Sequence, residues 1–135
     1  MTTSAVELWR MEIETRWSDM DAQDHINNLA YLEYMQECRV NWFTSLKLDE
    51  SFESVVVSIN IEYLQELLYP APVTVIMTGS DPGRSSFMSH YEIWTNNIRK
   101  ILFARGDAKI VFIDSQKRRS VSMPLSVKDK LEQPH

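Results

Sequence analysis

A dense group of reactive side chains lies near the N-terminus, in the segment Asp19-Met20-Asp21-Ala22-Gln23-Asp24-His25, which is followed by Ile26-Asn27-Asn28. A carboxylate can act as a general base or as a nucleophile, and an imidazole can act as a general acid or base. Three aspartates and one histidine within seven residues could therefore carry out hydrolysis. An acidic loop that only caps the next helix has the same composition, so composition alone leaves both interpretations open.

The start of this segment imitates a calcium-binding loop, but the spacing excludes that alternative. Asp19, Asp21 and Gln23 stand where an EF-hand has its first ligands. That loop then needs glycine at its sixth position and glutamate at its twelfth, where this chain has Asp24 and Ala30. We therefore predict no metal site here.

The glycine positions exclude two classes of nucleotide-binding enzyme. The chain has 3 glycines, at Gly79, Gly83 and Gly106. Their spacing fits neither the GxGxxG of a dinucleotide-binding site nor the GxxxxGKS or GxxxxGKT of a P-loop. A Rossmann nucleotide site and a P-loop ATPase are therefore excluded.

Length, cysteine content and charge limit the class of protein. The 135 residues predict a single domain spanning 1–135, with a modest core that self-association could complete. One cysteine cannot form an intrachain disulfide, which fits a reducing compartment, and a net charge of −5 argues against nucleic acid as the main partner. The apolar stretches are too short to cross a bilayer, and the N-terminus lacks the features of a signal peptide. We expect a cytoplasmic protein without membrane insertion.

The elements around the acidic segment follow from hydrophobic periodicity. Residues 11–17 alternate with a period of two, which predicts a strand before the segment. After it, apolar residues at spacings of three and four predict a long helix capped by Asn27 or Asn28. The apolar stripe of this helix consists of Leu29, Leu32, Met35, Cys38, Trp42 and Leu46. Unpaired backbone N–H groups at the helix start could stabilise an oxyanion beside the aspartates.

The period of two returns after the helix. Four more strands are predicted over residues 55–63, 73–78, 86–95 and 101–114, and a short helix over 125–131. Turns are expected at 80–83 and 96–97, and Gly106 is expected at a bulge. Strands joined this tightly are antiparallel, so the predicted fold class is α+β, with one helix covering one face of a five-stranded antiparallel sheet. Such a half-covered sheet commonly pairs with a second subunit.

Several motifs resemble those of a known family. The run Arg16-Trp17-Ser18-Asp19-Met20-Asp21-Ala22-Gln23-Asp24-His25-Ile26-Asn27-Asn28, with Tyr31-Leu32-Glu33-Tyr34 and Glu37-Cys38-Arg39, closely resembles the opening of hotdog-fold acyl-CoA thioesterases of the 4-hydroxybenzoyl-CoA thioesterase-like family. Later pieces agree: Gly83-Arg84-Ser85-Ser86-Phe87, Ala104-Arg105-Gly106 and Met123-Pro124. The resemblance covers most of the chain, roughly from Met11 to Pro124. It implies a hotdog fold, in which a five-stranded antiparallel sheet wraps around one long central helix.

The resemblance also implies roles for individual residues. Asp21 matches the family's catalytic carboxylate, which attacks the thioester carbonyl or activates water for that attack. His25 and Asn27 match a His-x-Asn pattern, and we interpret them as residues that order the loop or line the thioester pocket. A histidine general base stays open as an alternative. Asp19 is expected to shape the loop rather than to react, and Asp24 stands where the family commonly has glycine.

The implied substrate is an acyl-CoA, with no metal and no cofactor beyond the CoA that the substrate brings. The phosphates of CoA need basic partners, and the candidates are Arg84 and the cluster Lys117, Arg118 and Arg119. The resemblance further implies a homodimer or a homotetramer with sites at subunit interfaces.

Two alternatives come from different functional classes on the same fold. One is a non-catalytic module that binds acyl-CoA or an acyl-carrier protein, which the presence of Asp21 disfavours. The other is a hotdog dehydratase, which would use a catalytic histidine with an acid on the helix and fits the Asp-x-Asp segment less well. The sequence leaves the acyl group undetermined.

Overall fold

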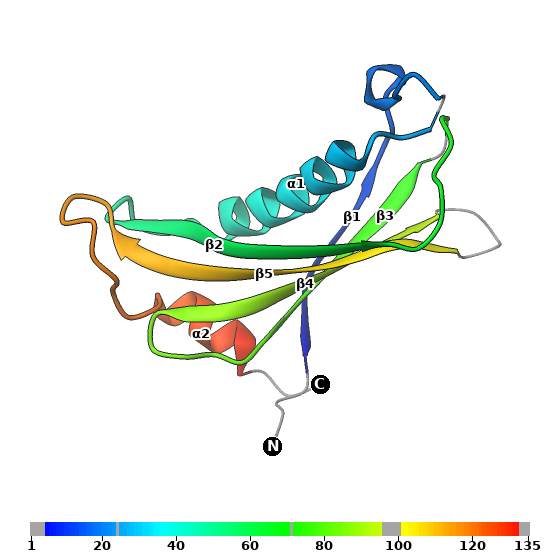
Figure 1. The fold of residues 1–135 in the computed structure, drawn as a ribbon. Coiled ribbons are helices and arrows are strands. Elements are labelled where there is room, and N and C mark those ends of the chain that lie inside the picture. Colours follow the sequence, from blue (N-terminus) through cyan, green and yellow to red (C-terminus); the bar gives the residue numbers. More distant parts are fainter. Residues whose placement is uncertain (1–4, 24, 71, 96–100, 133–135) are drawn as a thin grey trace.

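The computed structural model describes residues 5–23, 25–70, 72–95 and 101–132. It contains one five-stranded antiparallel sheet, with strand order β1-β3-β4-β5-β2 (Figure 1). The strands are β1 (Val6–Ile13), β2 (Phe52–Tyr63), β3 (Val73–Ser80), β4 (Ser86–Thr95) and β5 (Leu102–Asp114). The helices are η1 (Trp17–Asp19, a 3-10 turn), α1 (Asn28–Leu46) and α2 (Leu125–Leu131). The predicted order of one strand, one long helix and four strands is confirmed.

The long helix α1 lies across one face of the sheet, mainly over β1 and β3 (Figure 1). Its buried residues are Ala30, Tyr31, Tyr34, Met35, Cys38 and Trp42. Of the predicted stripe, Met35, Cys38 and Trp42 are buried, and Leu32 and Leu46 are partly buried against the core, so the prediction is wrong at Leu29. Leu29 is 64% exposed because the buried face is turned toward the two tyrosines instead.

Gly106 lies in regular pairing, and the predicted bulge at this residue is wrong. It pairs with Ile61 on one side and Tyr91 on the other, whereas the register shifts lie elsewhere in β2 and β4. A Cβ atom at this position would approach Met35 Cε to 2.7 Å. The Met35 side chain of α1 thus packs directly against the backbone of β5 at Gly106, and a larger residue there would require this flexible side chain to shift.

The first strand is shifted toward the N-terminus relative to the prediction. It spans Val6–Ile13 and pairs with β3, whose first residue, Val73, lies opposite Ile13. The register of β1 with β3 ends at this pair, so the alternation that continues to Trp17 does not extend β1. Trp17 instead begins η1 and is 72% exposed.

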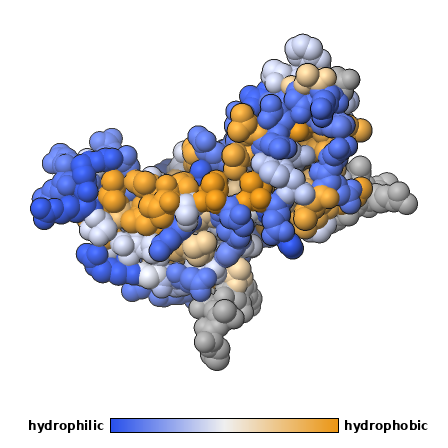
Figure 2. Space-filling model, in the orientation of Figure 1, coloured by the Kyte–Doolittle hydropathy of each residue, from blue (hydrophilic) through white to orange (hydrophobic). Residues whose placement is uncertain are grey.

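The edge strand β2 carries apolar side chains that α1 does not cover. Val56, Ile59 and Tyr63 are exposed, although their β5 partners Ile110, Ala108 and Ala104 are all buried. These side chains therefore lie on the face of the sheet that bears the helix. Figure 2 shows the corresponding apolar band along the middle of the molecule.

No helix within the described residues is long and apolar enough to span a membrane. Asp24 and the predicted turn at 96–97 lie outside the described residues.

Candidate active site

The acidic segment folds into a narrow hairpin just before α1. Met20 and Ile26 form an isolated antiparallel bridge, and the Asp21 N–H donates to the His25 carbonyl at 2.8 Å. The Asn27 N–H donates to the Asp19 carbonyl, also at 2.8 Å. These bonds fix the position of the segment relative to the first turn of the helix.

Asp19 is buried and anchors this hairpin to α1. Its Oδ2 accepts a hydrogen bond from the Tyr34 hydroxyl at 2.7 Å and one from the Arg16 N–H at 3.0 Å. The Arg16 Nε lies 3.5 Å from Oδ1. Burial, followed by the hydrogen bond to Asp19, raises the pKa of Tyr34, so the hydroxyl keeps its proton and remains a donor. Asp19 therefore acts as a structural group.

Asp21 is exposed and less constrained than Asp19. Its Oδ1 accepts the Gln23 N–H at 2.8 Å and the His25 N–H at 3.4 Å. Both contacts use the same oxygen, so within the described part of the chain Oδ2 can meet a water molecule or a substrate carbonyl. The backbone of the loop thus orients the Asp21 carboxylate through Oδ1, and Oδ2 remains available to a substrate.

The segment after β2 folds back over the hairpin and completes the site. The Ile26 N–H donates to the Leu67 carbonyl at 2.8 Å, and the His25 Nε2 lies 3.3 Å from Glu66 Oε2. The Leu67 N–H in turn donates to the Tyr31 hydroxyl at 3.2 Å. Sequence reasoning missed Glu66 and Leu67 because no local pattern links them to a loop forty residues earlier in the chain.

The helix start is capped by Asn27, one of the two predicted candidates. Its side-chain Oδ1 accepts the Leu29 N–H at 2.9 Å, and its carbonyl accepts the Ala30 N–H at 2.9 Å. The Tyr63 hydroxyl donates to the Asn28 carbonyl at 3.1 Å, and its ring meets that of Tyr31 edge-on at 5.2 Å. The end of β2 is thereby tied to the beginning of α1.

These elements enclose an open pocket of about 410 Å³. It is lined by Asp21, Gln23, His25, Ile26, Asn27, Asn28, Tyr31, Tyr63, Leu64, Gln65 and Glu66. The structure therefore brings together the three predicted site residues Asp21, His25 and Asn27. In the described ranges, no three His, Cys, Asp or Glu side chains are grouped so that they could hold a metal ion.

A comparison with protein families identifies the chain. Residues 15–131 match the model of the thioesterase-like superfamily, which is most of the 135 residues. The chain belongs to this superfamily. At the level of reaction class it is a thioester hydrolase.

Two individual proteins are similar to this chain. The long-chain acyl-CoA thioesterase FadM of Escherichia coli is 27% identical over 135 residues, covering 90% of this chain and 96% of FadM. The protein YsmA of Bacillus subtilis is 26% identical over 83 residues, covering 59% of this chain and 56% of YsmA.

Solved structures establish the fold. The PA2801 protein of Pseudomonas aeruginosa superimposes with a TM-score of 0.86 at 29% identity, covering 91% of this chain and 97% of that protein. Slr0204, a 1,4-dihydroxy-2-naphthoyl-CoA thioesterase from Synechocystis, gives a TM-score of 0.82 at 19% identity, covering 93% and 98%, and shows likeness of fold alone. The predicted hotdog fold is confirmed.

The basic residues predicted to bind CoA lie far from Asp21 within this thioesterase-like chain. Arg84 follows β3, and Lys117, Arg118 and Arg119 follow β5, at the end of the sheet opposite the acidic hairpin (Figure 1). Arg118 forms an ion pair with Glu53. The Lys117 and Gln116 N–H groups donate to Asp114 and lower the pKa of its carboxyl group. One chain alone does not unite these residues with the pocket.

Proposed function

We propose that the chain hydrolyses acyl-CoA thioesters to a free acid and CoA, with Asp21 as the reacting carboxylate. The observation that carries this proposal is the oriented, exposed Asp21 carboxylate in a pocket at the start of α1, in a chain of the thioesterase-like superfamily. The similarity to FadM, a long-chain acyl-CoA thioesterase, supports CoA as the thiol. The reaction needs no metal and no cofactor beyond the CoA of the substrate.

Asp21 can serve in either of two ways, both of which consume one water. As a general base, it takes a proton from water while the hydroxide adds to the carbonyl carbon. The C–S bond then breaks, and the CoA thiolate receives that proton. As a nucleophile, Asp21 forms an anhydride with the acyl group, releases CoA, and is regenerated when water hydrolyses the anhydride.

The negative charge on the carbonyl oxygen needs a hydrogen-bond donor in either route. The Leu29 and Ala30 N–H groups already donate to Asn27. We therefore assign the N–H group of Asn28, the first residue of α1, to the oxyanion. The dipole at the N-terminus of α1 favours this charge.

His25 and Asn27 hold this geometry in place. The backbone of His25 contacts Asp21 through both its N–H and its carbonyl, while its ring lies beside Glu66. Asn27 fixes the first turn of the helix as its N-cap. Both residues position the reacting groups in this proposal.

A second copy of the chain is proposed to cover β2. An edge strand offers unpaired N–H and C=O groups, and its apolar residues Val56, Ile59 and Tyr63 are exposed on the described surface. Antiparallel pairing of β2 with its own copy satisfies a two-fold axis and buries this band. In such a dimer, Arg84 and the Lys117–Arg119 cluster of one copy come to the hairpin end of the other, where they could bind CoA phosphates.

A panel of acyl-CoAs, with released thiol as the readout, tests the proposed function. The wild-type protein should cleave at least one acyl-CoA, and Asp21→Asn should bind it without turnover. Thioester binding by wild type without cleavage would favour the alternative of an acyl-CoA or acyl-carrier-protein binding module. Full activity of Asp21→Asn would refute the assigned role of Asp21.

Light scattering tests the oligomer. Ile59→Lys places a charge in the middle of the exposed band and should convert the dimer to a monomer. If the mass of wild-type protein in solution equals that of one chain, the β2 pairing is wrong.

A further inference from the structure

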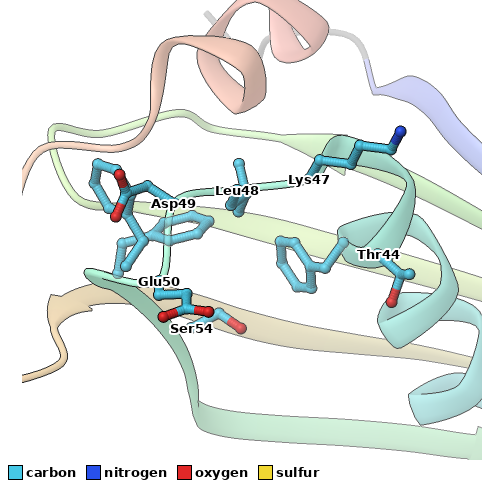
Figure 3. Close-up of a pocket in the computed structure, with 9 residues that line it drawn as sticks. Thr44, Lys47, Leu48, Asp49, Glu50 and Ser54 are labelled. Atoms are coloured by element: carbon cyan, nitrogen blue, oxygen red, sulfur yellow. The ribbon is translucent and has the colours of Figure 1, made fainter.

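A second pocket, of about 330 Å³, lies at the C-terminal end of α1 (Figure 3). Its apolar walls are Phe43, Leu48, Phe52 and Phe112, and its rim carries Thr44, Lys47, Asp49, Glu50 and Ser54. In Figure 3, Leu48 points in among the aromatic rings, whereas the ammonium group of Lys47 points away from them. The pocket therefore has an apolar interior and a charged rim.

The walls of this pocket are ordered by aromatic contacts. The ring of Phe43 meets that of Phe112 edge-on at 5.9 Å and that of Trp42 at 5.0 Å. Phe112 also stacks against Phe87 at 6.3 Å. The rings are thus held by the core behind them, so the hollow is built into the fold and is suited to an aliphatic or aromatic group.

Within one chain this pocket and the Asp21 pocket are far apart. The helix α1 starts at the Asp21 pocket and ends at the second one, and its 19 residues span about 28 Å. The strand β2 runs the opposite way, from Phe52 at the second pocket to Tyr63 at the first. The two pockets therefore sit at opposite ends of the same two elements.

Pairing of two β2 strands removes this separation. If antiparallel strands pair around the middle of β2, Phe52 of one copy lies beside Tyr63 of the other, and neighbouring strands are only about 4.8 Å apart. Both pockets open on the same face, because the β5 partners of Ser54 and Tyr63, namely Phe112 and Ala104, are both buried. The second pocket of one copy thus opens beside Asp21 of the other.

We propose that this second pocket binds the acyl group of the thioester that is cleaved at Asp21 of the other copy. The inference rests on the proposed function and names the part of its substrate that the Asp21 pocket does not hold. An uncharged acyl group fits the four apolar walls. The exposed carboxylates of Asp49 and Glu50 at the rim repel an acyl group that ends in a carboxylate.

Filling the pocket should change chain-length preference. Leu48→Trp adds an indole among the rings, and we expect the ratio of kcat/KM for dodecanoyl-CoA to that for acetyl-CoA to fall by about tenfold or more. Thr44→Trp, at an exposed rim position, repeats the test should Leu48→Trp fail to fold. Leu125→Trp, on the exposed side of α2, is the matched control and should leave the ratio unchanged. An unchanged ratio in both pocket variants overturns the proposal.

Mixing two defective chains tests which copy supplies the pocket. Asp21→Asn lacks the reacting carboxylate, and the pocket-filled variant lacks room for the acyl group. Each variant alone should therefore have a low kcat/KM for dodecanoyl-CoA. In a mixed dimer, one site combines an intact Asp21 with an open pocket, and random mixing should restore about a quarter of wild-type activity. Co-purification of two differently tagged chains verifies that mixed dimers form.

The outcomes separate the two proposals. No recovery in verified mixed dimers means that the pocket does not serve the other copy's Asp21, and overturns this inference while leaving thioesterase activity intact. If wild-type protein cleaves no acyl-CoA, acetyl-CoA included, the proposed function fails, and this inference fails with it.

Discussion

Asp19 and Asp21 are separated by one residue, yet their surroundings differ in almost every respect. Asp19 is buried and receives the hydroxyl of Tyr34, the N–H of Arg16 and a longer contact from the Arg16 side chain. Asp21 is exposed, and in the described part of the chain its carboxylate accepts two backbone N–H groups at a single oxygen. One carboxylate is fully engaged in holding the hairpin, and the other is oriented but still able to react.

This contrast explains how a short acidic segment can be anchored to the fold and still expose a carboxylate. A buried carboxylate is tolerated because it is hydrogen-bonded on several sides. The Asp19 anchor fixes the hairpin against α1, which lets Asp21 remain exposed without moving freely. Changes at the two aspartates should therefore separate stability from activity.

The largest effect is expected for Asp21→Asn on turnover. An amide is neither a base nor a nucleophile of comparable strength, so kcat should fall by about 10²–10⁴-fold. The Asn side-chain oxygen can still accept the Gln23 N–H, so the melting temperature should stay near that of wild type. A large loss of stability in Asp21→Asn would break the contrast with Asp19.

Asp19→Ala should show the opposite pattern. It leaves the buried Tyr34 hydroxyl without its acceptor, and the free energy of unfolding should fall by about 3 kcal/mol. Urea denaturation followed by circular dichroism measures this change. At a temperature where the variant is folded, it should retain much more activity than Asp21→Asn; equal inactivity would mean that Asp19 takes part in the chemistry.

Tyr34→Phe removes the hydroxyl that donates to Asp19, and the free energy of unfolding should fall by about 1.5 kcal/mol. Since both variants break one hydrogen bond, the double variant Asp19→Ala/Tyr34→Phe should be less destabilised than the sum of the two changes. Denaturation of all four proteins gives the coupling energy. Additive effects would show that the two side chains do not interact in solution.

The smallest effect is expected for Glu66→Gln, which removes the charge beside the His25 ring. This pair is partly exposed, and such pairs contribute about 0–1 kcal/mol. The free energy of unfolding and kcat should both change little, because the backbone hydrogen bond from the Ile26 N–H to the Leu67 carbonyl persists. A large loss of kcat would instead place the His25 ring in the chemistry, as the alternative of a histidine base requires.

The parts of the site that the sequence could predict are local. The Asn27 cap, the helix that follows it and the acidic segment before it depend on residues close together in the chain, and all three were predicted. Burial of Asp19 was not evident, because it requires Tyr34 to lie on the inward face of a helix whose orientation was assigned too far toward Leu29. The end of β1 depends on where β3 begins, and the contact of Leu67 with Ile26 joins distant segments, so neither has a local signal.

The bare edge of β2 has a consequence for the fate of newly made chains. Its central run Val55-Val56-Val57-Ser58-Ile59-Asn60-Ile61 has β-branched residues at most positions and no charge, proline or glycine, which is the composition of segments that assemble into fibrils. Glu53 and Glu62 flank this run, and like charges on stacked copies oppose in-register assembly. If β2 pairs with a second copy as proposed, these two carboxylates oppose aggregation of a chain that has not yet met that copy, and neutralising them should shorten its lifetime.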